Sequence, residues 1–256
     1  MLTRQQIGAI AQREGLPSHA VERDYVQHLI LRRAAREPFV FKGGTCIRIA
    51  LGSPRYSEDL DFNAECTAGE TEAILREAAR RLAEYGIPAE VVRRHPESGN
   101  FQAIVRFQGP LFGEDPRSQG SIRIEVSLRR ERVEMEEVFV PRTPYADVPQ
   151  LVIRALTKEH LLAEKTRALV VRRKPRDLYD VQFLLSRGVA CSRSLLDEKM
   201  RLYGRRFRLG DLDEGIAEAG RTWDRDLGPL LGQAPPYPSV ADGVRTGFRR
   251  MLRGGT

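Results

Sequence analysis

The chain has 256 residues, of which 41% are hydrophobic, and it carries a formal net charge of +7. This length allows one large domain or two small ones, and the apolar content is enough for a sizeable core. Three cysteines without a Cys-x-x-Cys pair argue against a disulfide scaffold or a structural zinc site and fit a reducing cytosol. The excess positive charge suits a polyanionic partner, and it equally suits a solvated basic surface.

No apolar run approaches the length of a membrane-spanning helix, and the first residues contain no apolar signal core. We therefore expect a soluble protein in the cytoplasm, with no membrane partner.

The first half of the chain combines helix and strand patterns. Thr3 is a suitable N-cap for a helix that ends at Gly15, and Ser18 begins a second helix. Further along, the patterns predict a strand over 39–41, a helix over 45–51, a strand over 60–63, a helix over 69–85, and strands over 101–108 and 121–128.

From Thr157 onward the patterned segments are helical. Caps and apolar spacing predict helices over 157–172, 176–187, 192–204, 211–225 and 239–252. We therefore expect an α+β protein. Its N-terminal mixed-sheet domain, with a short helical lead-in, spans residues 1–149, and its C-terminal helical bundle spans 150–256.

An apolar run leads into a pair of glycines, Gly43 and Gly44. Glycine lets the backbone come close to a phosphate, and backbone N–H groups at such a turn can cradle that phosphate. Taken alone, such a pair more often marks a simple turn.

Two carboxylates follow on the next strand, Asp59 and Asp61, separated by one residue. At the end of a strand, twist or a bulge can turn both toward one cation. Paired aspartates suit Mg2+, or Mn2+, although a solvated sheet edge or a helix cap is the more common reason for such a pair. A phosphate cradle followed by a metal-binding pair is the minimum equipment for phosphoryl or nucleotidyl transfer, in which metal ions hold the attacking and the leaving oxygen.

Two signatures in the chain resemble a known family. The first is Lys42-Gly43-Gly44-Thr45 followed by Arg55-Tyr56-Ser57-Glu58-Asp59-Leu60-Asp61-Phe62. The second is a helix with a single lysine, Lys165, followed by Arg176-Asp177-Leu178-Tyr179-Asp180. In combination, order and spacing they resemble the AbiEii/AbiGii-type toxin nucleotidyltransferases of the DNA polymerase beta superfamily, which include mycobacterial tRNA-modifying toxins.

The resemblance implies a polymerase-beta-like nucleotidyltransferase domain followed by the helical bundle. It also implies the toxin of a toxin–antitoxin system, which transfers a nucleoside monophosphate from an NTP to the 3′ end of tRNA and so blocks aminoacylation and translation. A cognate antitoxin would be encoded nearby. The alternatives are nucleotidylation of a protein side chain and a non-catalytic RNA-binding module with this fold. The intact set of Asp59, Asp61, Lys165 and Asp177 argues against the module, and the basic charge favours RNA as acceptor.

The resemblance also assigns roles in the first signature. Asp59 and Asp61 would bind the metal, and a third carboxylate on a later strand would activate the acceptor hydroxyl. Glu125 is the candidate for that third position, with a solvated edge residue as the alternative.

The remaining residues of this signature would contact the nucleotide. Gly43, Gly44 and Thr45 would reach the triphosphate through backbone N–H groups and a hydroxyl. Ser57 would bond a phosphate oxygen or fix the rotamer of Asp59. Arg55 is a further nucleotide-binding candidate. The alternative without a functional role is a surface salt bridge with Glu58.

In the second signature, Lys165 would contact triphosphate oxygens as a point charge, and the C-terminal domain would thus contribute Lys165 and Asp177 to the site. Asp177 and Asp180 are three residues apart and share a helix face, and Asp180 is a further nucleotide-binding candidate. Asp177 would orient Lys165 or bind the base and ribose, or it would merely complement the helix dipole. A neighbouring basic run would hold RNA phosphates, or form a solvated face; it comprises Arg172, Arg173, Lys174 and Arg176.

Overall fold

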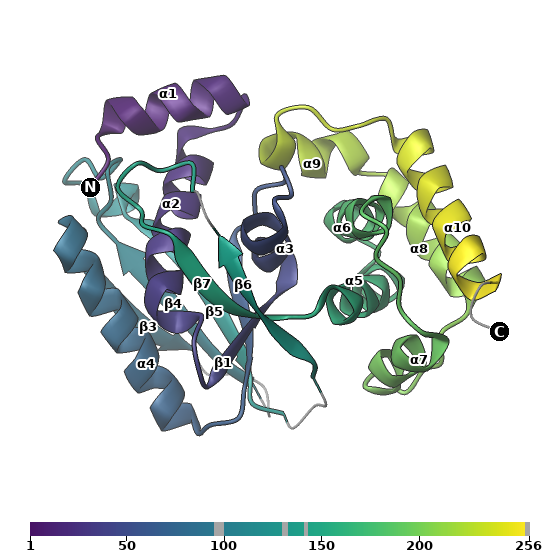
Figure 1. The fold of residues 1–256 in the computed structure, drawn as a ribbon. Helices are drawn as coiled ribbons and strands as arrows, with labels where there is room; N and C mark the ends of the chain where they lie inside the picture. The colour runs from purple at the N-terminus through teal and green to yellow at the C-terminus, as the bar shows by residue number, and fades with distance from the viewer. Residues whose placement is uncertain (95–99, 130–132, 141–142, 254–256) are drawn as a thin grey trace. The chain divides into compact units, whose positions relative to one another are not determined.

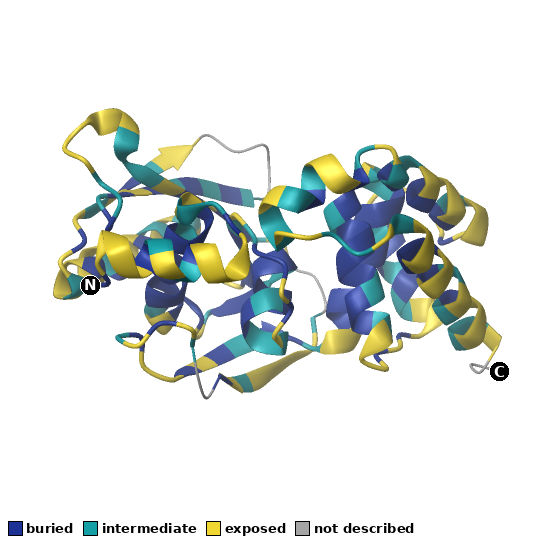
Figure 2. Ribbon diagram, turned by 90° about the horizontal axis from the view of Figure 1, so that it is seen from above, coloured by how far each residue is buried: buried dark blue, intermediate teal, exposed yellow. Residues whose placement is uncertain are grey.

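The computed structural model describes residues 1–94, 100–129, 133–140 and 143–253. The chain forms two compact units, Met1–Leu156 and Thr157–Thr256. In both units the exposed positions gather on the outward faces of the helices (Figure 2).

The N-terminal unit contains one mixed seven-stranded sheet with helices packed against it (Figure 1). Its elements are α1 (Arg4–Glu14), α2 (Ser18–Ala34), β1 (Phe39–Lys42), α3 (Gly43–Leu51), β2 (Asp59–Ala64), α4 (Ala68–Arg80), the 3-10 helix η1 (Arg81–Tyr85), β3 (Ala89–Arg94), β4 (Asn100–Phe107), the 3-10 helix η2 (Pro116–Ser118), β5 (Gly120–Ser127), β6 (Met135–Val140) and β7 (Leu151–Leu156).

The strand order is β3-β4-β5-β2-β1-β7-β6. Strand β2 pairs in parallel with β5, and β1 pairs in parallel with β7, while the other neighbours are antiparallel. Alternation along β2 separates two chemistries, because Leu60 and Phe62 are fully buried while Asp59 and Asp61 on the opposite face are partly exposed. The sheet therefore presents a polar face at its centre.

The first helix shows how the sequence determines local structure. The Thr3 side chain accepts a hydrogen bond from the Gln6 N–H, and the Gln6 side chain accepts one from the Thr3 N–H. The helix ends at Gly15, whose φ of 67° is left-handed. Both predicted ends of this helix are confirmed, because these caps satisfy backbone groups that have no partner within the helix.

Strands β3, β6 and β7 were not predicted from the sequence. Strands β3 and β6 lie at the two edges of the sheet, and a single side chain of each is buried, so they lack an apolar alternation. Strand β7 pairs with β1 and β6, which places the end of the N-terminal unit after Leu156 rather than at the expected residue 149.

The C-terminal unit is helical. Its elements are α5 (Lys158–Arg172), α6 (Pro175–Ser186), α7 (Arg193–Arg201), α8 (Leu209–Gly220), α9 (Trp223–Leu231) and α10 (Tyr237–Arg253). The helix predicted over 211–225 is in fact two, because α8 ends at Gly220 and α9 begins at Trp223. Across the described ranges, each helix is too short or too polar to span a lipid bilayer.

Candidate active site

A row of polar side chains crosses the centre of the sheet. Asp61 lies opposite Lys42 of β1 on one side and opposite Glu125 of the parallel strand β5 on the other. Glu125 in turn lies opposite Gln102 of β4. Paired positions in a sheet project from the same face, so Asp61 and Glu125 are neighbours on the polar face.

Asp59 shares this face because it precedes Asp61 by two residues, the period of a strand. The ladder between β2 and β5 runs in unbroken register from Asp59 to Asn63. The twist or bulge that we invoked for the aspartate pair is therefore unnecessary. Arg123 Nη1 lies 4.0 Å from Asp59 Oδ1. Three carboxylates, those of Asp59, Asp61 and Glu125, thus occupy two adjacent strands.

The glycine pair lies against this row. Gly43 begins α3 with a φ of 78°, and a Cβ at this position would collide with Asp61 Oδ2. A Cβ on Gly44 would collide with Arg55 Nη2 and lie 3.0 Å from Ser57 Oγ. Only glycine allows both approaches. The structure therefore brings the turn together with three of the predicted site residues.

The start of α3 has the properties of an anion-binding site. Its N-cap, Lys42, makes no side-chain capping bond. The first N–H groups of a helix have no partner within the helix, and the helix dipole adds partial positive charge there. Phosphate binds such helix ends, so the turn is suited to a triphosphate beside Asp61.

Thr45 has a different role from the predicted hydroxyl contact. It is buried, and its Oγ1 donates a hydrogen bond of 2.5 Å to the carbonyl oxygen of Asp59. The side chain therefore ties α3 to the start of β2 and positions the aspartate.

The proposed surface salt bridge between Arg55 and Glu58 is wrong. Arg55 is buried, and its Nη1 donates to the carbonyl oxygen of Tyr56 at 2.9 Å. Glu58 pairs instead with Arg23 of α2 at 2.8 Å. The Arg55 guanidinium is held beside Gly44, where it adds positive charge to the turn.

A buried ion pair connects α3 to α2. Arg48 of α3 binds Asp24 of α2, with Nε 2.5 Å from Oδ1, and the Tyr145 hydroxyl donates to Asp24 Oδ2 at 2.5 Å. Burial, the largest single effect, opposes ionisation of Asp24, but the charges of Arg48 and His28 and the hydrogen bonds from Arg48 and Tyr145 together outweigh it and hold the pKa of Asp24 below its ordinary value. Sequence reasoning missed this pair, and its one available signal was a lone arginine among apolar residues of a short helix.

Arg48 also fixes the segment that leads to the site. Its guanidinium lies 3.3 Å from the centre of the Tyr56 ring and donates to the carbonyl oxygens of Ser53 and Pro54, each at 3.3 Å. The ion pair therefore positions the residues that precede Arg55 and Ser57.

In the C-terminal unit, the second signature forms a buried ion cluster. Lys165 Nζ lies 2.7 Å from Asp180 Oδ2 and 3.4 Å from Asp177 Oδ1. Arg172 Nη2 lies 3.1 Å from the same Asp177 oxygen. Asp177 and Asp180 are completely buried and Lys165 is 7% exposed. Two positive and two negative charges thus balance, and Asp180 is the nearer partner of the lysine.

The basic run beside this cluster is partly neutralised. Arg172 pairs with Asp177, and Arg173 pairs with Glu214 at 2.9 Å. Lys174 is exposed and Arg176 is partly exposed. Half of the run is therefore bound to carboxylates within the same unit.

The acidic face fits a metal that is shared with a substrate. Within the described part of the chain, no three His, Cys, Asp or Glu side chains are grouped so as to enclose an ion. Mg2+ is commonly bound by one or two carboxylates together with waters and substrate phosphates. Asp59 and Asp61, on the polar face beside the start of α3, match that donor set.

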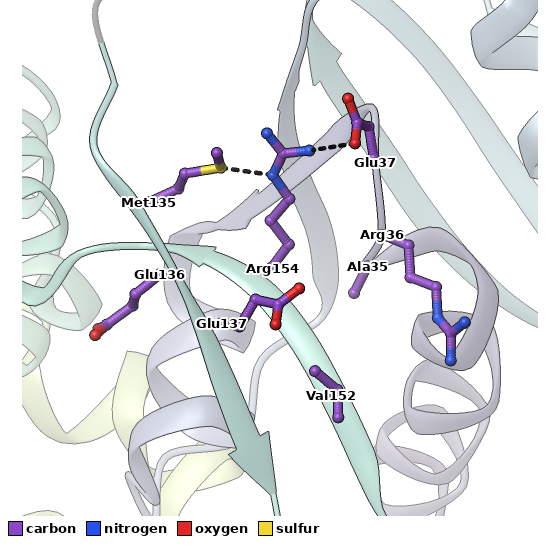
Figure 3. Close-up of a pocket in the computed structure, with 8 residues that line it drawn as sticks. All are labelled: Ala35, Arg36, Glu37, Met135, Glu136, Glu137, Val152 and Arg154. Atoms are coloured by element: carbon purple, nitrogen blue, oxygen red, sulfur yellow. Dashed lines mark hydrogen bonds and ion pairs between the residues drawn. The ribbon is translucent and has the colours of Figure 1, made fainter.

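A separate hollow at the β6–β7 edge does not share these properties (Figure 3). Its volume is about 550 Å³, and Arg154 spans it from Met135 to Glu37. Its lining has two arginines, Arg36 and Arg154, and three glutamates, so it has no excess positive charge that would attract a phosphate.

Comparison with known proteins identifies a family and solved structures with a similar fold. The model of the family described as nucleotidyl transferase AbiEii toxin, type IV TA system, matches residues 25–249. Among solved structures, the fold is similar to MenT4, a nucleotidyltransferase toxin from Mycobacterium tuberculosis, with a TM-score of 0.71, 20% identity, and coverage of 98% of this chain and 90% of that one. It is also similar to JHP933 from Helicobacter pylori, with a TM-score of 0.66, 18% identity and 94% coverage of each chain. No curated protein matches the chain.

Proposed function

This chain belongs to the AbiEii family of nucleotidyltransferase toxins of type IV toxin–antitoxin systems, and from that premise we propose that it transfers a nucleoside monophosphate from an NTP to the 3′ end of tRNA. The product could not be aminoacylated, so translation would stop. The observation that carries the chemistry is the close approach of the Gly43 turn to the Asp61 carboxylate, because it puts a phosphate site and a metal ligand side by side.

The nucleotide is held by groups of the turn. Backbone N–H groups of Gly43 and Gly44 bind the triphosphate oxygens at the start of α3, and the Arg55 guanidinium and Ser57 hydroxyl beside Gly44 add to this binding. Asp59 and Asp61 would bind Mg2+ or Mn2+, which neutralises charge on the leaving pyrophosphate when bound.

The transfer step needs a base and an oriented acceptor. The terminal 3′-hydroxyl oxygen attacks the α-phosphorus, the bond from that phosphorus to the β-phosphate bridging oxygen breaks, and pyrophosphate leaves. Glu125 accepts the hydroxyl proton. Its carboxylate is oriented by Asn100, whose Nδ2 donates to Oε1 at 3.0 Å.

Lys165 is proposed as a further contact to the triphosphate, on the family resemblance. Asp177 and Asp180 then act as positioning residues, because both carboxylates contact the ammonium group. The type IV family implies a cognate antitoxin. We place the reaction in the cytoplasm, where NTPs and tRNA are available.

The test is incubation with each labelled NTP, Mg2+ and total tRNA, followed by a denaturing gel. We expect label on tRNA, with none on tRNA whose 3′ ends were oxidised by periodate beforehand. Label that appears only on protein would establish the protein-acceptor alternative. No transfer from any NTP would leave a non-catalytic RNA-binding module as the better description.

A further inference from the structure

A second hollow, in the C-terminal unit, is lined by five arginines. Its volume is about 770 Å³, and the lining arginines are Arg173, Arg201, Arg205, Arg206 and Arg208. We call it the arginine hollow. Only Arg173 belongs to the basic run named from the sequence; the others lie at the end of α7 and in the connection to α8.

The arginine hollow has a large excess of positive charge. Two carboxylates line it, Asp211 and Glu214, and Glu214 is paired with Arg173. Between residues 143 and 253, and in the other described ranges, no carboxylate forms a salt bridge with the four remaining arginines. Clustered like charges repel, so such a group is stabilised by a bound polyanion.

The backbone of the α7–α8 connection is fixed by its own hydrogen bonds. Gly204 has a φ of 66°, its N–H donates to the Arg201 carbonyl at 2.9 Å, and the Arg205 N–H donates to the Met200 carbonyl at 3.2 Å. This pair of bonds is the Schellman arrangement, which ends a helix and sets the direction of the chain that follows. Arg205 is therefore placed by the end of α7.

Phe207 anchors the next part of the connection. It is completely buried, its ring stacks on Phe248 with centroids 5.7 Å apart, and its N–H donates to Asp197 Oδ1 at 2.8 Å. Arg206 and Arg208 flank this anchor and are exposed. The arginines thus extend from an ordered segment, which lowers the entropy cost of binding a ligand.

Two further features favour nucleic acid. The N-terminus of α8 adjoins the hollow, and its N-cap, Arg208, makes no side-chain capping bond, so N–H groups there add to the attraction for phosphate. Tyr203, next to Gly204, is 52% exposed, and Arg167 lies over its ring at 5.2 Å. An exposed aromatic ring beside arginines is the combination that binds unpaired bases together with their backbone.

We propose that the arginine hollow binds backbone phosphates of the RNA acceptor and that Tyr203 stacks on an unpaired base. The proposal rests on the proposed function for its choice of RNA. An acidic peptide would satisfy the charge, but it would have no base to stack on Tyr203.

The test compares two charge-matched triple variants by fluorescence anisotropy with labelled tRNA over a salt series. The first is Arg205→Gln/Arg206→Gln/Arg208→Gln. The control, Arg187→Gln/Arg221→Gln/Arg225→Gln, removes an equal number of positive charges from other positions in the same unit. Arg187 and Arg221 follow the C-terminal ends of α6 and α8, and the hollow lies at the N-terminal ends of those helices.

We expect the hollow variant to bind tRNA at least tenfold more weakly than the control at moderate salt. The slope of log affinity against log salt concentration should be less negative by about 2 for the hollow variant. Each lost phosphate contact removes about 0.7–0.9 from the size of that slope. Tyr203→Leu should weaken binding roughly tenfold and Tyr203→Phe should not, because stacking needs a ring. Circular dichroism and melting temperature establish that each variant is folded.

Equal losses in the two triple variants would overturn the proposal, because net charge alone would then explain binding. Equal binding by Tyr203→Leu and Tyr203→Phe would remove the stacking part. Failure of the proposed function is distinguishable, since it appears as missing transfer by the wild-type protein in the gel assay. If the wild-type protein transfers label to tRNA and both triple variants bind tRNA normally, the RNA-binding role of the arginine hollow is refuted and the proposed function stands.

Discussion

A side chain on Gly43 would collide with the carboxylate of Asp61. The two residues belong to different elements, the first turn of α3 and the centre of β2, and Lys42 and Asp61 are paired in the sheet. The turn that we propose to bind phosphate and the carboxylate that we propose to bind the metal are therefore fixed relative to each other by a β-ladder. Nucleotidyl transfer requires such an arrangement, because the metal ion and the reacting phosphate must be held next to each other.

Gly43→Ala should abolish transfer, because the new methyl group displaces Asp61. Gly52→Ala is the matched control, since Gly52 caps the other end of α3 with a φ of 74° and has no atom within 4 Å of a Cβ. Both changes incur a similar left-handed backbone cost, on the order of 1 kcal/mol. Transfer rates and melting temperatures of the two variants separate strain from collision, and equal activity losses would contradict our interpretation.

Asp59→Asn and Asp61→Asn should each lower the transfer rate by at least about 100-fold while changing the unfolding free energy by roughly 0.5 kcal/mol or less. Both side chains are partly exposed, so their loss leaves no cavity. Glu65→Gln, just beyond β2, is the control carboxylate. Activity of the wild type should disappear with EDTA and return with Mg2+. Normal transfer by either Asp variant at saturating Mg2+ would refute the metal assignment.

Glu125→Gln tests the proposed base separately. If Glu125 accepts the acceptor proton, the variant should bind NTP normally and transfer about 100–10,000-fold more slowly. Arg123→Gln, two residues earlier on the same face of β5, is the comparison. A Glu125→Gln enzyme with wild-type turnover would return this carboxylate to the solvated-edge alternative.

The fold was predictable where apolar alternation is strong. Strands β4 and β5 alternate buried and polar residues along their length and were found, whereas β3 and β6 lie at the sheet edges, where few side chains are buried. Periodicity records burial rather than hydrogen bonding, so edge strands give a weak signal.

The site was predictable where its residues are close in sequence. The Gly43 turn and the Asp pair lie within 20 residues and carry the family signature. The Asp24–Arg48 pair and the arginine hollow join residues from separate elements, and no local pattern links them. The partnership of Lys165 with Asp180, rather than mainly Asp177, was decided by packing of α5 against α6.

Lys165→Met should destabilise the protein strongly, because it leaves Asp177 and Asp180 buried with one fewer positive charge. Breaking a buried ion pair in this way typically costs about 3–5 kcal/mol. Lys165→Met/Asp180→Asn should recover part of that loss, as measured by urea unfolding. Reduced activity of a Lys165 variant therefore supports triphosphate contact only if the recovered double variant is also inactive.

His28 should make stability depend on pH below about 6.5, the ordinary pKa of histidine. Its ring is buried against Tyr145, and Nδ1–H donates to the Asp24 carbonyl oxygen at 2.7 Å. Burial outweighs the attraction of Asp24 and lowers the pKa of His28 below its ordinary value of 6.5. The folded state therefore keeps the neutral ring.

Because the unfolded chain takes up a proton at His28 below pH 6.5 and the folded protein does not, the unfolding free energy falls as pH decreases. The slope from this one group is at most about 1.4 kcal/mol per pH unit. Asp24, whose pKa is lowered, acts in the same direction, and its contribution begins to fall only near its ordinary value of 3.8. Urea unfolding at pH 7.5 and 5.0 should show a smaller difference for His28→Gln than for the wild type, and His19→Gln, an exposed position on the same helix, should keep the wild-type difference. If both variants retain the wild-type pH dependence, the loss arises from other groups and His28 is not the buried neutral histidine that we describe.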